Sequence, residues 1–229
     1  MVVRSKKAFR CFSVLNYIVT CNDIHLLIKD TGSNVIADSM QLIAGRTGQE
    51  YNQRKARHGA FWEDRYHATA IEADEHLQRC LVYIDLNMVR ARVVSHPSNW
   101  AHSGYWEIQN PPKRYAIIDL PELSSLCGFN GVTDFQQAHR KWVTAALSES
   151  VVREGNWSEA IAVGNFNFVE KVKSELGSKA AHREVTQLEC TYVLREDGEA
   201  YGRNFGGKNE PLSLENTRFW NEFSRTTAT

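Results

Sequence analysis

One segment, residues 75–92, carries apolar side chains on two faces of a helix. Its main stripe consists of Leu77, Leu81, Ile84 and Met88, and its second face of Val82, Leu86 and Val89. A helix with two apolar faces must be covered on two sides, so the fold has to place other elements against both. Tyr83 and Asn87 are four residues apart and lie together on the remaining side of the helix, which we expect to stay free of apolar packing.

Two β-rich apolar runs precede the helix, at residues 12–20 and 24–29. A short polar turn, Cys21-Asn22-Asp23, separates them and predicts a hairpin. Apolar spacing close to 3.6 residues predicts a helix over 35–53, and residues 65–72 are expected to form a third strand.

The pattern of residues changes from Ser95 onward, where many aromatic residues and interrupting prolines indicate irregular structure. Beyond it the patterns predict helices over 134–149 and 166–176 and a strand over 188–196. We therefore expect a domain at residues 1–110 and, at residues 111–229, a mostly helical or irregular extension of unknown role.

Composition narrows the classes of protein. The 229 residues suit one large domain or two small ones, and 42% hydrophobic residues argue against wholesale disorder. No apolar run approaches the roughly 18 residues of a membrane span, and no small-residue cleavage site follows the basic start, so a cytoplasmic protein is predicted. The five cysteines are odd in number and lack CxxC spacing, which argues against a disulfide framework or a zinc site.

The zero net charge hides an asymmetry: residues 1–100 hold 13 basic and 10 acidic side chains, and residues 101–229 hold 14 and 17. The sharpest basic excess lies between Arg46 and His58. This excess permits nucleic-acid binding, because phosphate contacts need only a local patch, but a solvated polar face explains it equally well.

Three groups of residues could carry chemistry. Asp23 and His25 are two positions apart, so in a strand both side chains lie on the same face and could hold a divalent ion. An Asp that stabilises the turn beside a hydrogen-bonded histidine explains the pair too. Tyr83 beside Asn87 is alone typical of a structural hydrogen-bonding pair. Between these elements, GAFWEDRYHATAIE interleaves aromatic and cationic side chains, which suits single-stranded nucleic acid or a hairpin that buries its Phe and Trp.

Together these motifs carry a family resemblance. The order NYIVTCNDIHLLI, a helix, GAFWEDRYHATAIE and LVYIDLNMVRARVVSHPSNWAHSGY resembles the single-tyrosine HUH transposases over about residues 9–106. The branch it resembles most is the REP-associated tyrosine transposases of bacteria. The resemblance implies a ferredoxin-like α+β domain and a transposase that acts in DNA recombination.

The resemblance also implies roles for site residues. His25 matches the second histidine of the family's His-x-His metal motif, and Asp23 stands where the family has the first histidine. Tyr83 falls on the family's nucleophile and Asn87 on its third metal ligand, with Mg²⁺ or Mn²⁺ as the ion. Asp23 is a hard oxygen ligand that suits either ion, but it adds negative charge beside the phosphate.

The implied reaction is cleavage and transfer of single-stranded DNA near a hairpin, through a 5′-phosphotyrosine that conserves the bond energy. A tyrosine hydroxyl with a pKa of about 10 needs a nearby cation for this attack. The expected DNA contacts are Arg65, Trp62, Tyr66, Arg54, Lys55 and Arg57. The alternatives are an inactive relative that binds hairpin DNA without cleaving it, and an ordinary α+β domain with a decayed motif.

The resemblance finally implies an N-terminally incomplete domain. Family members begin with a strand and a helix before the segment that matches residues 9–30, and here only about eight residues precede it. A gap in the sheet would expose strand edges, so we expect a homodimer or another segment, such as 188–196, to fill it.

Overall fold

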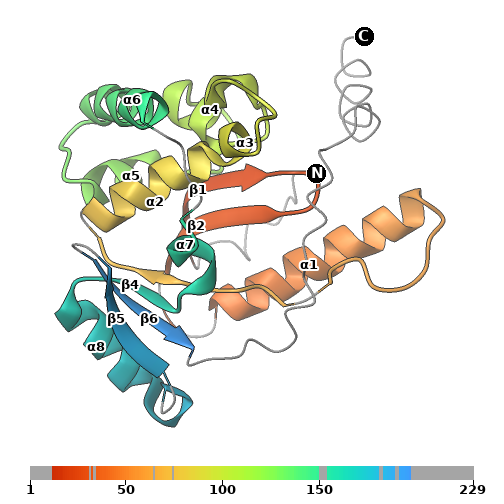
Figure 1. The fold of residues 1–229 in the computed structure, drawn as a ribbon. Helices are drawn as coiled ribbons and strands as arrows, with labels where there is room; N and C mark the ends of the chain where they lie inside the picture. The colour runs from red at the N-terminus through yellow and green to blue at the C-terminus, as the bar shows by residue number, and fades with distance from the viewer. Residues whose placement is uncertain are drawn as a thin grey trace.

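The computed structural model describes residues 12–30, 32, 35–63, 65–73, 75–149, 154–180, 183–188 and 191–196. They form a mixed α+β fold with two sheets, one of order β1-β2 and one of order β3-β4-β6-β5 (Figure 1). The strands are β1 (Phe12–Val19), β2 (Ile24–Asp30), β3 (Ala70–Ile71), β4 (Ala162–Gly164), β5 (Arg183–Leu188) and β6 (Thr191–Glu196). Among the described strands, no pairing joins the two sheets.

The predicted N-terminal hairpin is confirmed. β1 and β2 pair antiparallel, with Ile18 opposite His25 and a register shift between Val14 and Asn16. Leu15, Ile18 and Leu27 are buried and face the core.

The predicted helix over 75–92 is present but interrupted. It divides into α2 (Glu75–Asp85) and α3 (Asn87–Arg90) at Leu86, which has φ −83° and ψ 5°. The amide of Leu86 still donates to Val82 and that of Arg90 to Leu86, so the axis continues through the distortion.

Both apolar faces of this helix are covered, as the sequence predicts. The main stripe packs into the core that contains the hairpin. The second face packs against Val143 of α6 (Val132–Ser148) and against Tyr105. The helix thus lies between the hairpin on one side and α6 on the other (Figure 1).

The region expected to be irregular holds short helices. They are η1 (Pro97–Asn99), α4 (Gly104–Gln109) and α5 (Leu120–Leu126). Single bridges join this region to the outer edge of β1, between Ile18 and Ser103 and between Val14 and Ile118. Gly104 is required at the contact, because a Cβ there would lie 2.1 Å from the Asn16 side-chain oxygen.

The main hydrophobic core crosses the boundary expected at residue 110. Ile118, Leu123 and Phe135 lie in the same buried cluster as Ile18 and Leu81. The division into domains at 1–110 and 111–229 stays a prediction, but the side chains on its two sides share one core.

The second sheet corrects two expectations. Residues 65–72 do not form a full strand: only Ala70–Ile71 pair, in parallel with β4. Residues 67 and 69 instead direct their side chains to the Ala160 carbonyl, with distances of 2.8 and 2.6 Å. The extension is less irregular than expected, because it supplies β4, β5 and β6.

The remaining helices of the extension surround this sheet. They are α7 (Asn156–Glu159), α8 (Phe166–Leu176) and η2 (Gly177–Ala180), and α8 confirms the prediction over 166–176. Val169 of α8 packs against Ala162 and Leu194 of the sheet. In the described segments, no helix combines the length and the hydrophobicity that a membrane crossing requires.

Candidate functional site

The first predicted metal ligands lie where the hairpin turns into β2. The Thr20 hydroxyl accepts a hydrogen bond from the Asp23 amide at 2.9 Å, and the Thr20 amide donates to the Asp23 carbonyl at 2.9 Å. These hydrogen bonds fix the backbone of Asp23, and the residue is exposed to solvent. His25 is half-buried and shares a strand face with Leu27, which is buried in the core against α2.

The predicted nucleophile, Tyr83, is half-buried near the end of α2. The Arg90 guanidinium carbon lies 3.7 Å from the centroid of its ring, and the Trp157 ring lies 6.3 Å away, centroid to centroid. Asn87, also half-buried, begins α3 one turn after Tyr83. The structure thus brings Tyr83 together with two residues that the sequence did not indicate.

The helix that carries Tyr83 is fastened to the hairpin that carries His25. The Asn16 amide of β1 donates to the Asp85 carboxylate at 3.0 Å and to the Leu81 carbonyl at 3.4 Å. Tyr83 and the start of β2 therefore belong to neighbouring, tightly packed elements. That Asp23, His25 and Asn87 meet on one ion stays a prediction.

The donor set suits a hard divalent cation. Asp23 and Asn87 would offer oxygen and His25 a single imidazole nitrogen, a combination compatible with Mg²⁺ or Mn²⁺. Among the residues described, no group of three or more His, Cys, Asp or Glu side chains is placed to hold a metal. The predicted set contains only two such side chains and an amide.

The predicted DNA contacts cluster after α1 (Val35–Arg54), which agrees with the predicted helix over 35–53 and has no buried residue. Trp62 lies against this helix: its indole nitrogen donates to the Ala44 carbonyl at 2.9 Å, and its ring contacts Phe61 edge-on at 4.8 Å. Trp62 is thus engaged in packing, as the alternative interpretation expects.

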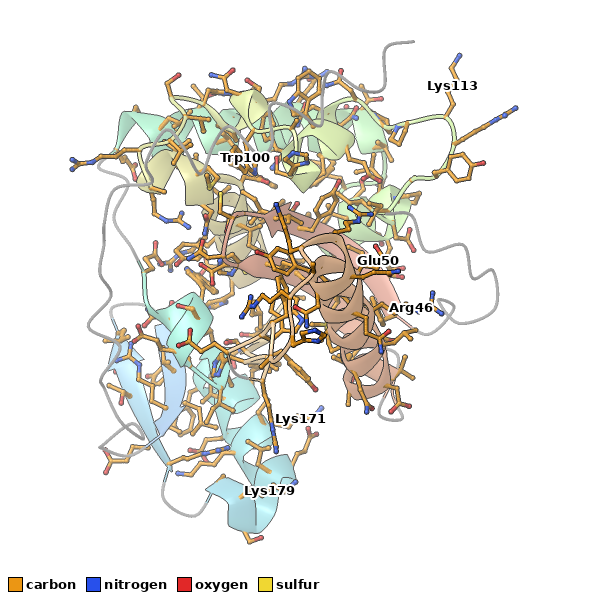
Figure 2. All side chains as sticks on the ribbon, turned by 90° about the vertical axis from the view of Figure 1, so that its right-hand side faces the viewer. Arg46, Glu50, Trp100, Lys113, Lys171 and Lys179 are labelled. Carbon is orange, nitrogen blue, oxygen red and sulfur yellow. The ribbon has the colours of Figure 1, made fainter. Side chains whose placement is uncertain are left out.

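The polar members of the set reach the surface. Arg65 is exposed, and Tyr66 retains 48% of its accessible surface. Arg54, Lys55 and Arg57 are exposed as well; Arg54 lies 3.5 Å from Glu50, and Arg57 donates to a backbone carbonyl at 3.1 Å. In Figure 2, Arg46 of α1 lies well apart from Lys113 and Lys171.

We expect Arg65→Ala and Trp62→Ala to weaken binding of single-stranded DNA in different ways. Loss of Arg65 should flatten the salt dependence of the affinity, because a phosphate contact releases counterions. Loss of Trp62 should cost about 1–3 kcal/mol of binding only if a base stacks on its ring. Anisotropy titrations at several salt concentrations measure both, and circular dichroism shows whether Trp62→Ala instead loosens α1.

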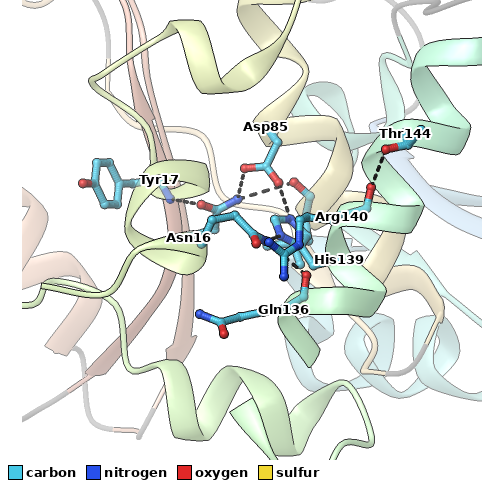
Figure 3. A network of polar contacts seen from close by, with 9 residues as sticks. Asn16, Tyr17, Asp85, Gln136, His139, Arg140 and Thr144 are labelled. Carbon is cyan, nitrogen blue, oxygen red and sulfur yellow. Dashed lines mark hydrogen bonds and ion pairs between the residues drawn. The ribbon is translucent and has the colours of Figure 1, made fainter. Parts of the chain in front are cut away.

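A buried polar network lies behind the site and escaped the sequence analysis. The Nε2–H of His139 donates to the Asp85 carboxylate at 2.6 Å (Figure 3). The Gln109 amide donates to His139 Nδ1 at 2.9 Å. Asp85 and His139 have no accessible side-chain surface. A carboxylate between Ile84 and Leu86 in an apolar helix does signal a buried partner, but nothing in the sequence identifies it as His139.

The comparisons with known proteins place a transposase-type domain at the N-terminal part of the chain. Residues 2–87 match the family described as "Transposase IS200 like", and the matched segment includes the hairpin, α1 and α2. The match covers less than half of the 229 residues, so it shows a likeness of this segment to that family. No curated protein and no solved structure matches the chain.

Proposed function

We propose that this protein cleaves single-stranded DNA near a hairpin and transfers the strand through a tyrosine-linked intermediate. The observation that carries the proposal is the position of Tyr83: it lies within the matched transposase domain, on the helix that packs against the hairpin bearing His25. The finer features of the proposal are a ferredoxin-like core, resemblance to the REP-associated branch, and a homodimer.

The reaction follows from the chemistry of the residues. The Tyr83 hydroxyl oxygen forms a bond to phosphorus, the bond to the 3′ oxygen breaks, and solvent carries the proton from the phenol to the leaving oxygen. The products are a 5′-phosphotyrosine and a free 3′-hydroxyl, so no separate energy source is needed. Asp23, His25 and Asn87 would hold Mg²⁺ or Mn²⁺, which when bound offsets the charge that develops on the phosphate.

One observation favours a second function. Asp23 replaces a neutral ligand by a carboxylate, which places negative charge where the phosphate must approach. The second candidate is therefore an inactive relative that binds hairpin DNA without cutting it.

An end-labelled single strand that contains a hairpin separates these functions. Cleavage that requires Mn²⁺ or Mg²⁺ supports the enzyme. A gel shift without cleavage supports the binding protein. Neither cleavage nor a shift, over a series of hairpin sequences, contradicts both.

We expect Asp23→His to increase Mn²⁺-dependent cleavage, because it restores two imidazoles on one strand face and removes the charge beside the phosphate. His25→Ala is the matched control and should lower affinity for Mn²⁺, measured by calorimetry. Unchanged Mn²⁺ binding in both variants would contradict a metal site at the start of β2.

A further inference from the structure

Two residues that follow the matched segment lie near the Tyr83 ring. The Arg90 guanidinium carbon lies over the ring, 3.7 Å from its centroid. The ring of Trp157, in α7, lies 6.3 Å from it, centroid to centroid, at an interplanar angle of 44°. Tyr83 therefore has a cation over its ring face.

Further polar contacts connect α7 to α2 near Tyr83. The Trp157 indole donates to Glu154 at 2.9 Å, and Glu154 lies 3.4 Å from Arg79. Arg79 precedes Tyr83 by one helical turn, so α7 is fastened to the same flank of α2 that carries Tyr83. Arg90 also lies on this flank, since seven residues are close to two full turns.

The chemistry of this pair fits an incoming phosphate. A guanidinium is always charged, stacks on aromatic faces and presents paired N–H donors that match phosphate oxygens. Both Arg90 and Tyr83 are half-buried, so each residue keeps part of its surface exposed to solvent. A phosphate bonded to the Tyr83 oxygen would lie beside a cation that the structure already holds in place.

We propose that Arg90 is a catalytic residue that donates hydrogen bonds to the phosphate that Tyr83 attacks. This inference rests on the proposed function, since it takes Tyr83 as the nucleophile. It extends the site to Arg90, three residues past the end of the matched domain. The ligand it assigns to this flank is the 5′-phosphate of a DNA strand.

The first test needs no catalysis. Short single strands with and without a 5′-phosphate are titrated against Tyr83→Phe, which leaves room at the site and forms no adduct. This variant should prefer the phosphorylated strand about tenfold, as expected for hydrogen bonds to a charged group. Adding Arg90→Gln should remove the preference, and adding Arg140→Gln, an exposed arginine of α6, should leave it unchanged.

Two results would overturn the inference: equal affinity of Tyr83→Phe for both strands, or a preference that survives Arg90→Gln. Should the Arg90→Gln variant fail to fold, Arg90→Lys is tested in its place. Lysine keeps the charge but lacks the paired N–H donors of the guanidinium, so an undiminished preference for the 5′-phosphorylated strand would contradict the proposed contact. In the presence of Tyr83, Arg90→Gln should lower the rate of adduct formation about 10- to 100-fold. Adducts without any effect of Arg90 refute this inference alone. A phosphate preference that depends on Arg90, without adducts, refutes the proposed function and with it the catalytic role of Arg90, and leaves only phosphate binding.

Discussion

Tyr83→Phe is expected to abolish covalent capture of single-stranded DNA while leaving its affinity for DNA nearly unchanged. The substitution removes one hydroxyl, and the ring that contacts Arg90 and Trp157 remains. The measurement is a denaturing gel of protein incubated with labelled DNA and Mn²⁺, in which an adduct survives the denaturant.

Tyr115→Phe provides a matched control, because Tyr115 is a tyrosine that retains 67% of its accessible surface and has no predicted role at the site. It should retain the adduct. A denaturant-resistant adduct in the Tyr83→Phe variant would show that another residue is the nucleophile.

Asp85→Ala is expected to be among the most destabilising single substitutions in the protein. Asp85 is fully buried and accepts hydrogen bonds from His139 and Asn16. Its removal leaves the buried His139 Nε2–H without its acceptor and takes from Asn16 one of its two acceptors. Breaking such a buried pair typically costs about 3–5 kcal/mol of the free energy of unfolding. Urea denaturation of the purified variant measures this loss.

Two further variants test whether the loss of stability comes from the broken Asp85–His139 pair. Asp134→Ala removes an exposed carboxylate of α6 and should change stability by less than about 0.5 kcal/mol. The double variant Asp85→Leu/His139→Leu should recover much of the loss, because an apolar pair leaves neither partner unsatisfied. A loss below about 1 kcal/mol in Asp85→Ala would mean that the network contributes little to stability.

Local patterns were sufficient for most of the N-terminal elements. The hairpin follows from two β-rich runs around a polar turn, and the two apolar faces of residues 75–92 correctly require cover on two sides. The distortion at Leu86 could not be predicted, because Leu86 is an ordinary helix former and lies within the apolar pattern.

Elements that depend on distant partners were the ones missed. The strand expected over 65–72 shrinks to Ala70–Ile71 because its hydrogen-bond partner, β4, lies some 90 residues away and is only three residues long. The partner of Asp85 was missed for the same reason, since His139 lies in an ordinary-looking helix. At the site, the sequence predicted roles for Tyr83 and Asn87 but none for Arg90, although Arg90 lies in the segment that carries the resemblance. It gave no sign of Trp157, because a ring contact between distant residues leaves no spacing motif.

The order of strands in the second sheet determines when this sheet can form during folding. β3 pairs only with β4 among the described strands, and the other edge of β4 pairs with β6, so this sheet closes only after residue 196 has been synthesised. Pairings between such distant segments form slowly, because the intervening chain must first be brought together. On the ribosome, the hairpin and α2 therefore emerge long before the segment carrying Arg65 and Tyr66 gains its anchor, and the nascent chain passes through a stage in which that segment is still untethered.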